Sequence, residues 1–338
     1  MRVLIAGGSG LIGGPATRAL LARGHDVTLL TRGSHPVPAG VRALNADRTE
    51  ERSLFAALEG AAFDVVVDLL AYDAADVERI FRVPGCVFGR YLFASTGQVY
   101  LVSSECRPPF READAALPPM PEPAANTRDH GQWTYGVGKR AAERAARGLG
   151  AARGVCTTAL RLPVVQGAGD PSRRLWAYLQ RLRDGGPLLL PDGGEQPVRF
   201  VWAEDVARAL VSLAELPPPP GPAYNIAQPD ERPLREFVSL AAKALGVTPR
   251  FATCTWEQAR EAGLDHQFST YSGAWCSRPD PALALRDFGF LGSTTETWLP
   301  EVVRAHLAER DPAPHPGYAR RAVEIALAER IAGPPGKA

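Results

Sequence analysis

The first fourteen residues constrain the fold of this 338-residue chain more than any other stretch. A short apolar run, 2–6, leads into the glycine-rich segment 7–14 and then into a helical pattern at about 12–23. A buried strand, a glycine-rich turn and a helix in this order open a dinucleotide-binding βαβ unit. The glycines let the backbone approach a pyrophosphate, and the helix N-terminus holds its negative charge. The segment fits two spacings, Gly-x-Gly-x-x-Gly over 8–13 and Gly-x-x-Gly-x-x-Gly over 7–13.

Strand and helix patterns then alternate through the first half of the chain. The alternation predicts an α/β fold with a doubly wound parallel (Rossmann) sheet, whose ligands bind beyond the carboxyl ends of the strands. The expected strands cover 2–6, 26–30, 41–44, 63–70, 90–94 and 157–162, and the expected helices cover 12–23, 50–59, 74–83 and 132–149. Several candidate site residues follow these strands directly: the 7–13 loop, Arg32, Asp47, Leu69–Ala71 and Thr96.

The pattern changes after residue 170, where helices dominate and strands are short. We expect a Rossmann domain at 1–166 with returns near 198–226, and a smaller, mostly helical substrate-binding region at 167–197 and 227–332. A disordered tail is expected at 333–338. The proline-rich connection 104–131 is long for a compact domain and is typical of a lid or binding loop. The later helices are expected at 172–184, 203–216, 233–245, 256–262, 295–309 and 317–331, and the short strands at 187–190, 196–201 and 224–226.

The end of the second strand bears on the choice of cofactor. An NAD-selective site usually has an Asp or Glu here to accept from the ribose 2′-OH, whereas an Arg accommodates a 2′-phosphate. The residues here are Thr31, Arg32 and Gly33, with no acid among them. We therefore expect NADP, with NAD as the alternative.

The helix expected at 132–149 carries a Tyr-x-x-x-Lys motif. Residues four apart lie on one face of a helix, so the ammonium of Lys139 lies beside the phenol of Tyr135. A free phenol has a pKa near ~10, and a nearby cation favours the phenolate. The pair is therefore a candidate proton shuttle near neutral pH.

Composition excludes several other classes of protein. The 38 basic and 37 acidic residues give a net charge of +1, which argues against nucleic acid or a membrane as the main partner. The five cysteines are scattered, without metal-ligand spacing, and are typical of reduced thiols in a cytosol. No apolar run is long enough to span a bilayer, and no signal peptide is recognised. We expect a soluble, cytoplasmic protein without a metal.

With these motifs in order, the chain resembles the extended short-chain dehydrogenase/reductases, and more narrowly their NAD-dependent epimerase/dehydratase branch. The resemblance rests on the 7–13 loop, Ser95-Thr96, Tyr135-x-x-x-Lys139 and Arg161-Leu-Pro163 followed by Gly167. The segments HDVTLLTRG, NADR, FDVVVDLLAY and VRFVWAEDVARAL are similar to a divergent subgroup that includes the chloroplast stem-loop-binding proteins. The likeness covers about residues 1–310.

The resemblance implies a role for each candidate residue. Tyr135 is the acid/base, Lys139 holds the nicotinamide ribose, and Thr96 hydrogen-bonds the substrate oxygen. The implied cofactor contacts are Gly7, Gly10, Leu11, Ile12, Gly13, Arg32, Asp47 at the adenine amine, Arg48, Leu69, Leu70, Ala71, Ser95, Tyr135, Lys139 and Pro163 at the nicotinamide. Relatives also form homodimers, here through the helices at 74–83 and 132–149.

Three departures concern the substrate rather than the cofactor. Sugar-nucleotide epimerases often hold the diphosphate with an arginine, and Arg199 is one residue out of register with that position. On a strand, a shift of one residue turns the side chain to the other face. The proline-rich loop stretches the Thr96–Tyr135 spacing, and the usual His-Ala-Ala after the fourth strand is absent. Each departure weakens the case for a nucleotide-sugar substrate.

The leading hypothesis is an NAD(P)-dependent epimerase or oxidoreductase that takes hydride from a secondary alcohol of a sugar-like small molecule. The alternative is an NADPH-dependent ketoreductase, which Arg32 and the missing diphosphate arginine favour. A dehydratase ranks third, because Gly97 and Gln98 stand after Thr96 where an acidic pair is needed. A cofactor-binding protein with an RNA or regulatory role is a hypothesis of another class, and the balanced charge argues against it.

Overall fold

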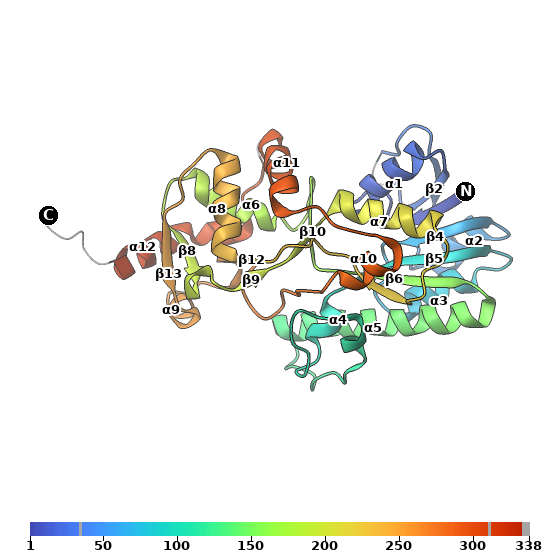
Figure 1. Ribbon diagram of the computed structural model, residues 1–338, viewed down its shortest axis with the longest axis horizontal. Helices are drawn as coiled ribbons and strands as arrows, with labels where there is room; N and C mark the ends of the chain where they lie inside the picture. Colours follow the sequence, from blue (N-terminus) through green and yellow to red (C-terminus); the bar gives the residue numbers. More distant parts are fainter. Residues whose placement is uncertain (34–35, 310–311, 333–338) are drawn as a thin grey trace, which may run out of the picture. The chain divides into compact units, whose positions relative to one another are not determined.

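The structure is a computed structural model that describes residues 1–33, 36–309 and 312–332. The chain forms two compact units, each built from several segments (Figure 1). Unit 1 comprises 1–165, 201–227 and 277–292, and unit 2 comprises 166–200, 228–276 and 293–338. The disordered tail expected at 333–338 lies outside the described residues.

A seven-stranded parallel sheet forms the centre of unit 1 and confirms the predicted fold class. Its order is β11-β6-β5-β4-β1-β2-β3, and every described pairing in it is parallel. The strands are β1 (Arg2–Ala6), β2 (Asp26–Thr31), β3 (Arg42–Asn45), β4 (Ala62–Asp68), β5 (Val87–Thr96), β6 (Cys156–Leu162) and β11 (Ala223–Asn225).

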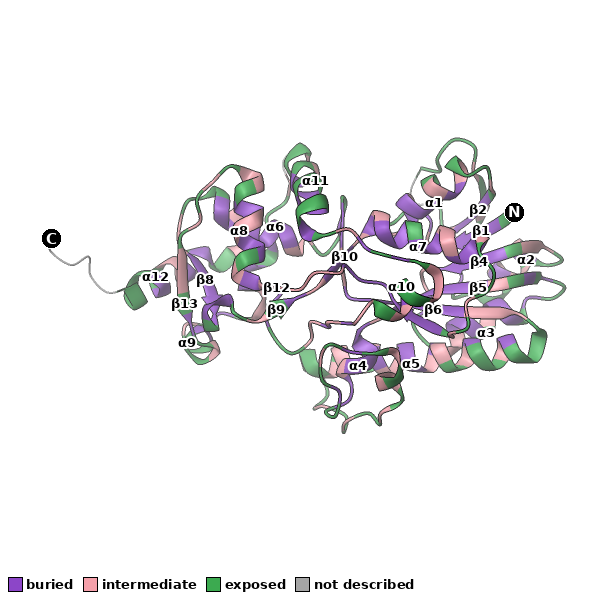
Figure 2. Ribbon diagram, in the orientation of Figure 1, coloured by how far each residue is buried: buried purple, intermediate pink, exposed green. Residues whose placement is uncertain are grey.

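The central strands are apolar on both sides because helices cover both faces of the sheet. Val3 and Ile5 of β1 face one apolar core, which includes side chains of α1 (Gly13–Ala22) and α7 (Ala203–Glu215). Leu4 and Ala6 face the other core, with side chains of α2 (Glu51–Leu58), α3 (Ala74–Arg82) and α5 (Arg128–Arg153). Alternate residues of a strand point to opposite faces, so one short run supplies both cores. Figure 2 shows these strands as buried.

Helix α5 is longer than the 132–149 segment expected from sequence. The Thr127 hydroxyl accepts from the His130 N–H at 3.1 Å and caps the helix N-terminus. Gly154, with φ +67°, ends the helix in the left-handed conformation that favours glycine. Between the caps, Ala142 and Ala146 pack on the sheet, while Gly136 lets the helix approach the backbone of Gln98. The small side chains therefore set how closely α5 lies to the sheet.

One segment expected in the substrate-binding region belongs to unit 1 instead. Residues 277–292 contain α10 (Ala282–Phe288), and Phe288 packs edge-on against Tyr224 of β11 at a ring separation of 5.1 Å. The Asn225 side chain donates to the Asp280 carbonyl oxygen at 3.0 Å. The second region is therefore shorter than the expected 227–332.

Unit 2 is built around a cluster of aromatic side chains. Phe200, Phe237, Tyr271 and Trp298 meet with ring separations between 4.7 and 6.2 Å. Strand β13 (Phe251–Cys254), which the sequence pattern did not predict, pairs with β8 (Leu188–Pro191). The other elements are α6 (Arg174–Arg183), β9 (Pro197–Val198), β12 (Arg232–Pro233), α8 (Leu234–Leu245), α9 (Trp256–Glu261), α11 (Thr295–Ala308) and α12 (Arg321–Ala332).

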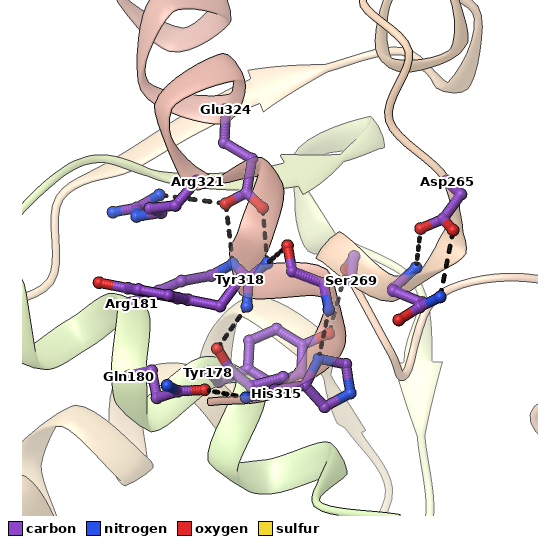
Figure 3. Close-up of polar contacts among 12 residues, drawn as sticks. Tyr178, Gln180, Arg181, Asp265, Ser269, His315, Tyr318, Arg321 and Glu324 are labelled. Atoms are coloured by element: carbon purple, nitrogen blue, oxygen red, sulfur yellow. Dashed lines mark hydrogen bonds and ion pairs between the residues drawn. The ribbon is translucent and has the colours of Figure 1, made fainter. Parts of the chain in front are cut away.

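A partly buried ion-pair network also ties α6 to α12 within unit 2 (Figure 3). Arg181 donates from Nε and Nη2 to the Glu324 carboxylate at 2.8 and 2.5 Å. Arg321 donates to Glu324 at 3.2 Å and to Asp184 at 2.6 and 2.8 Å. Burying charge is costly unless each group is paired, so this set stabilises the unit only as a whole.

No helix in the described ranges is long and apolar enough to cross a membrane.

Candidate active site

The glycine loop after β1 has a shape that only glycine permits at two positions. Gly7 has φ +89°, and a Cβ on Gly13 would lie 2.0 Å from the Gly7 carbonyl oxygen. Ser9 and Gly10 are exposed. Within the described chain, no side chain caps the N-terminus of α1 and no acid lies in its first turn. The loop therefore presents backbone N–H groups and the positive end of a helix dipole to an anion.

Arg32 and Asp47 follow neighbouring strands, β2 and β3, at the same edge of the sheet. The Asp47 carboxylate accepts from the Thr49 hydroxyl at 2.7 Å and from the Thr49 N–H at 2.8 Å. These hydrogen bonds, with a smaller contribution from the charge of Arg32, lower the pKa of Asp47. Arg32 itself is exposed at the strand end, where a 2′-phosphate is expected.

Arg48, which we expected at the cofactor, instead points into the protein. Its Nη1 pairs with Asp68 Oδ1, its Nη2 donates to Asp68 Oδ2 at 2.9 Å, and Nη2 also donates to the Asp76 carbonyl at 3.1 Å. Asp68 also accepts from the Tyr91 hydroxyl at 2.8 Å and from the Leu70 N–H at 2.9 Å. Burial alone would raise the pKa of Asp68, but the Arg48 guanidinium holds it below its usual value. The Arg48–Asp68 ion pair, through the hydrogen bond from the Leu70 N–H, therefore holds the start of the 69–71 segment in place.

Lys139 of α5 links its helix to strand β5 and to the segment after β4. Its Nζ donates to the carbonyl oxygens of Ala71, after β4, and Ala94, in β5, at 2.6 and 2.7 Å. It lies 5.8 Å from the centre of the Tyr135 ring, as the four-residue spacing predicts. An ammonium has three N–H donors, so these two described bonds leave one for a ligand.

Burial changes the chemistry of this lysine. The residue is only 3% exposed, and this desolvation lowers the pKa of the Lys139 ammonium from 10.5 to about 8. The charge of Asp68 opposes the effect, whereas that of Arg48 adds to it. Lys139 therefore changes charge close to neutral pH, which an exposed lysine does not do.

Tyr72 is a site residue that the sequence reasoning missed. Its ring lies 4.8 Å from Lys139 Nζ and 6.2 Å from the Tyr135 ring, and the residue is 53% exposed. An exposed aromatic ring over a buried ammonium is a cation–π contact that shields the charge from water. The sequence feature that could have indicated Tyr72 is an aromatic residue directly after the expected cofactor segment 69–71.

The two hydroxyl residues that end β5 serve different purposes. Ser95, expected at the cofactor, is buried and donates to Glu143 of α5 at 2.6 Å. Glu143 is also held by two hydrogen bonds from Arg161 at 2.9 and 2.6 Å. Thr96 is half-buried, and its Oγ1 accepts from the Gln98 N–H at 3.2 Å. This hydrogen bond does not use the Thr96 O–H proton.

The remaining predicted residues lie at the ends of strands or in unit 2. Pro163 is buried directly after β6, and Leu69 and Leu70 are half-buried after β4. Arg199 lies in unit 2, 3.6 Å from the Glu231 carboxylate. No group of His, Cys, Asp and Glu side chains in the described ranges could hold a metal ion.

Residues 3–227 match the model of the NAD dependent epimerase/dehydratase family. The chain belongs to this family. A 2′-dehydrokanamycin reductase of Streptomyces kanamyceticus is 30% identical over 81% of this chain and 75% of that protein. The chloroplast stem-loop binding protein of 41 kDa b of Arabidopsis thaliana is 26% identical over 63% of this chain and 54% of that protein. Both matches agree with membership of the epimerase/dehydratase family.

The fold agrees with this assignment. The crystal structure of UDP-N-acetylglucosamine 4-epimerase from Bacillus cereus matches with a TM-score of 0.69 and 18% identity, over 93% of this chain and 99% of that chain. The epimerase/dehydratase family is named for a nicotinamide cofactor, and the residues present fit one. Gly10 is exposed, with open space around it, and the N-terminus of α1 is uncapped among the described residues. Lys139 keeps one N–H donor beyond its two described hydrogen bonds.

Proposed function

We propose that this protein is an NAD(P)-dependent oxidoreductase that interconverts a secondary alcohol and a ketone on a sugar-like small molecule. The single observation that carries the proposal is the placement of the Lys139 ammonium 5.8 Å from the Tyr135 ring, at the carboxyl ends of β4 and β5. The bound nicotinamide supplies or accepts the hydride. Tyr135 exchanges a proton with the substrate oxygen, and the adjacent Lys139 charge stabilises the phenolate.

The other residues position the reacting oxygen. The Thr96 hydroxyl donates to it, and the close approach of Gly136 to Gln98 brings the Thr96 turn against α5. Ser95, Glu143 and Arg161 hold the same helix to β5 and β6. We therefore assign Tyr135 and Thr96 to contact with the substrate and give Ser95 a positioning role.

Reduction of a ketone is the direction that we favour. The related Streptomyces protein is a reductase by name, and Arg32 without a neighbouring acid suits NADPH, a reductant. Epimerisation at the same carbon needs the same groups, but also requires the cofactor to stay bound between two hydride transfers.

The test of the mechanism is Tyr135→Phe. We expect turnover of keto-sugar substrates, followed as NADPH oxidation, to fall by roughly 10²–10⁴-fold, because the phenolic proton is lost. The dissociation constant for NADPH should change by less than about twofold, since the ring remains. Tyr318→Phe in unit 2 is the matched control and should keep full turnover. Equal loss in both variants, or full activity in Tyr135→Phe, contradicts the mechanism.

The test of the cofactor choice is Arg32→Glu. An acid at this position repels a 2′-phosphate and accepts from a 2′-OH, so the preference should move from NADP towards NAD by about tenfold or more. Fluorescence titration with both cofactors measures the ratio of their dissociation constants. Arg42→Glu, an exposed change of the same charge on β3, is the control. An unchanged ratio in Arg32→Glu means that Arg32 does not contact the cofactor.

An RNA-associated role without turnover is the competing proposal. The name of the Arabidopsis relative supports it, but the balanced charge of +1 does not. RNA binding predicts a mobility shift of a stem-loop RNA with a steep dependence on salt. Such a shift, together with inactivity on every keto-sugar tested, favours this alternative.

A further inference from the structure

A cavity in unit 1 is lined by residues other than the predicted cofactor residues, although Ser95 donates to Glu143 in its wall. Its volume is about 520 Å³, and its walls come from α5, from the 3₁₀ helix η1 (Glu112–Ala116) with the following 117–119, and from 221–223 beside the edge strand β11. None of the residues lining it is among those that we assign to the cofactor or the reaction. The volume lies within the range of small-molecule sites, about 300–1,000 Å³.

The cavity is strongly and unequally charged. Four arginines line it, and Arg161 is neutralised by its two hydrogen bonds to Glu143. Arg140, Arg144 and Arg147 form no ion pair with any described residue. They are spaced at i, i+4 and i+7, so they share one face of α5. Like charges this close repel one another, and an apolar wall concentrates their field in the cavity.

The other acid in the wall, Glu112, offsets only part of this charge. The Glu112 carboxylate accepts from the Asn225 N–H at 2.8 Å and faces a partly buried surrounding. Burial raises the pKa of Glu112. Even with both carboxylates ionised, the four arginines in the wall outnumber Glu112 and Glu143. The cavity therefore keeps an excess of positive charge at neutral pH.

Arg140 is a buried cation whose guanidinium has no anionic partner among the described residues. It is 7% exposed, its Nε donates to the Val99 carbonyl at 2.7 Å and its Nη1 to the Leu117 carbonyl at 2.6 Å. Its Nη2 has no hydrogen-bond partner in the described chain. A buried charge without a counter-ion is unfavourable, and so is a buried donor without a hydrogen-bond acceptor. The unpartnered Nη2 of Arg140, in the wall of the cavity, is therefore a donor that an anion could accept.

We propose that this cavity is a binding site for a small dianionic metabolite, a phosphate ester or a dicarboxylate, recognised by Arg140, Arg144 and Arg147. A guanidinium is a planar fork that binds carboxylate or phosphate oxygens through two parallel hydrogen bonds. The exposed Arg144 and Arg147 reach the ligand first, and the field of the buried Arg140 draws the charge inward. The apolar wall, which includes Leu117, Pro118 and Leu283, suits the carbon skeleton of a metabolite.

The experiment is a calorimetric titration of the full chain with inorganic phosphate and, separately, with malonate, each against chloride at equal ionic strength. We expect saturable binding of at least one probe, and the tighter of the two identifies the anion class. The double variant Arg144→Gln/Arg147→Gln should weaken that binding by about tenfold or more, since each charged hydrogen bond lost contributes at least this much. Both side chains are exposed, so the variant should fold.

The control is Arg128→Gln/Arg153→Gln, which removes the same charge from exposed positions of α5 outside the cavity. It should change the affinity by less than about twofold. If phosphate binds at the glycine loop instead, both double variants should bind it as tightly as the unmodified protein does. Unchanged affinity in both double variants therefore overturns the proposal. Equal loss in the two double variants, or binding no tighter than that of chloride in the unmodified protein, also overturns it.

Discussion

Replacing Lys139 by Met tests whether burial sets the charge of this lysine. The pKa of the ammonium falls from 10.5 to about 8 in the folded protein because the side chain is desolvated. One pKa unit corresponds to about 1.4 kcal/mol, so burial disfavours the charged form by about 3 kcal/mol. Methionine has a similar length and no charge, and it removes this contribution at every pH.

The sign follows from proton binding. Between the folded pKa of about 8 and the unfolded value of 10.5, the unfolded chain binds more protons than the folded one, so stability rises with pH. The contribution of Lys139 is fully present above pH 10.5 and is lost as pH falls through about 8. The free energy of unfolding of the unmodified protein, minus that of Lys139→Met, should therefore rise by about 3 kcal/mol between pH 7 and pH 10.5.

Urea titrations of both proteins at half-unit steps of pH measure this difference, and titrations common to both cancel in the subtraction. A difference that stays constant from pH 7 to 10.5 refutes the reasoning, because it means that Lys139 has an ordinary pKa. Turnover provides an independent reading. If the ammonium stabilises the Tyr135 phenolate, the activity of the unmodified protein should fall above about pH 8 as Lys139 loses its proton.

Two further predictions concern the surroundings of this lysine. Tyr72→Ala opens Lys139 to water, so the rise in the free energy of unfolding with pH should begin closer to pH 10.5. Tyr72→Phe keeps the ring, so this rise should still begin near pH 8. Identical pH profiles for the Ala and Phe variants would mean that the ring does not shield the charge. Asp68→Asn leaves the Arg48 guanidinium buried without a counter-ion, so the free energy of unfolding should fall by about 3 kcal/mol or more in urea. The control is Asp64→Asn, an exposed pair partner on the same strand, and a loss as small as that of the control contradicts the buried-pair account.

Local signals were sufficient to predict most of the sheet. The strands of the first half are short apolar runs bounded by turn residues, and each packs between helices, so pattern and burial agree. The glycine loop was equally clear, because the positive φ of Gly7 and the contact at Gly13 leave no other residue type. Strand β13 and helix α10 gave no such signal. They are short, and their positions depend on partners distant in sequence, β8 and Tyr224.

The same distinction explains which site residues were predicted. Tyr135 and Lys139 are four apart on one helix, so their proximity follows from the sequence itself. The partner of Arg48 is 20 residues away and that of Ser95 is 48 away, and only the folded sheet brings either pair together. Sequence reasoning therefore placed both residues at strand ends but could not predict their hydrogen bonds to Asp68 and Glu143.

The two buried ion pairs also explain why Lys139 responds mainly to burial. Asp68 and Glu143 each favour its charged form, but both carboxylates are paired with arginines, Arg48 and Arg161. An anion that is already neutralised by a neighbouring guanidinium offers a third group little net attraction. Desolvation consequently dominates, and the amine is charged near neutral pH but loses its proton a little above it. The arginines therefore leave burial as the main influence on the pKa of Lys139.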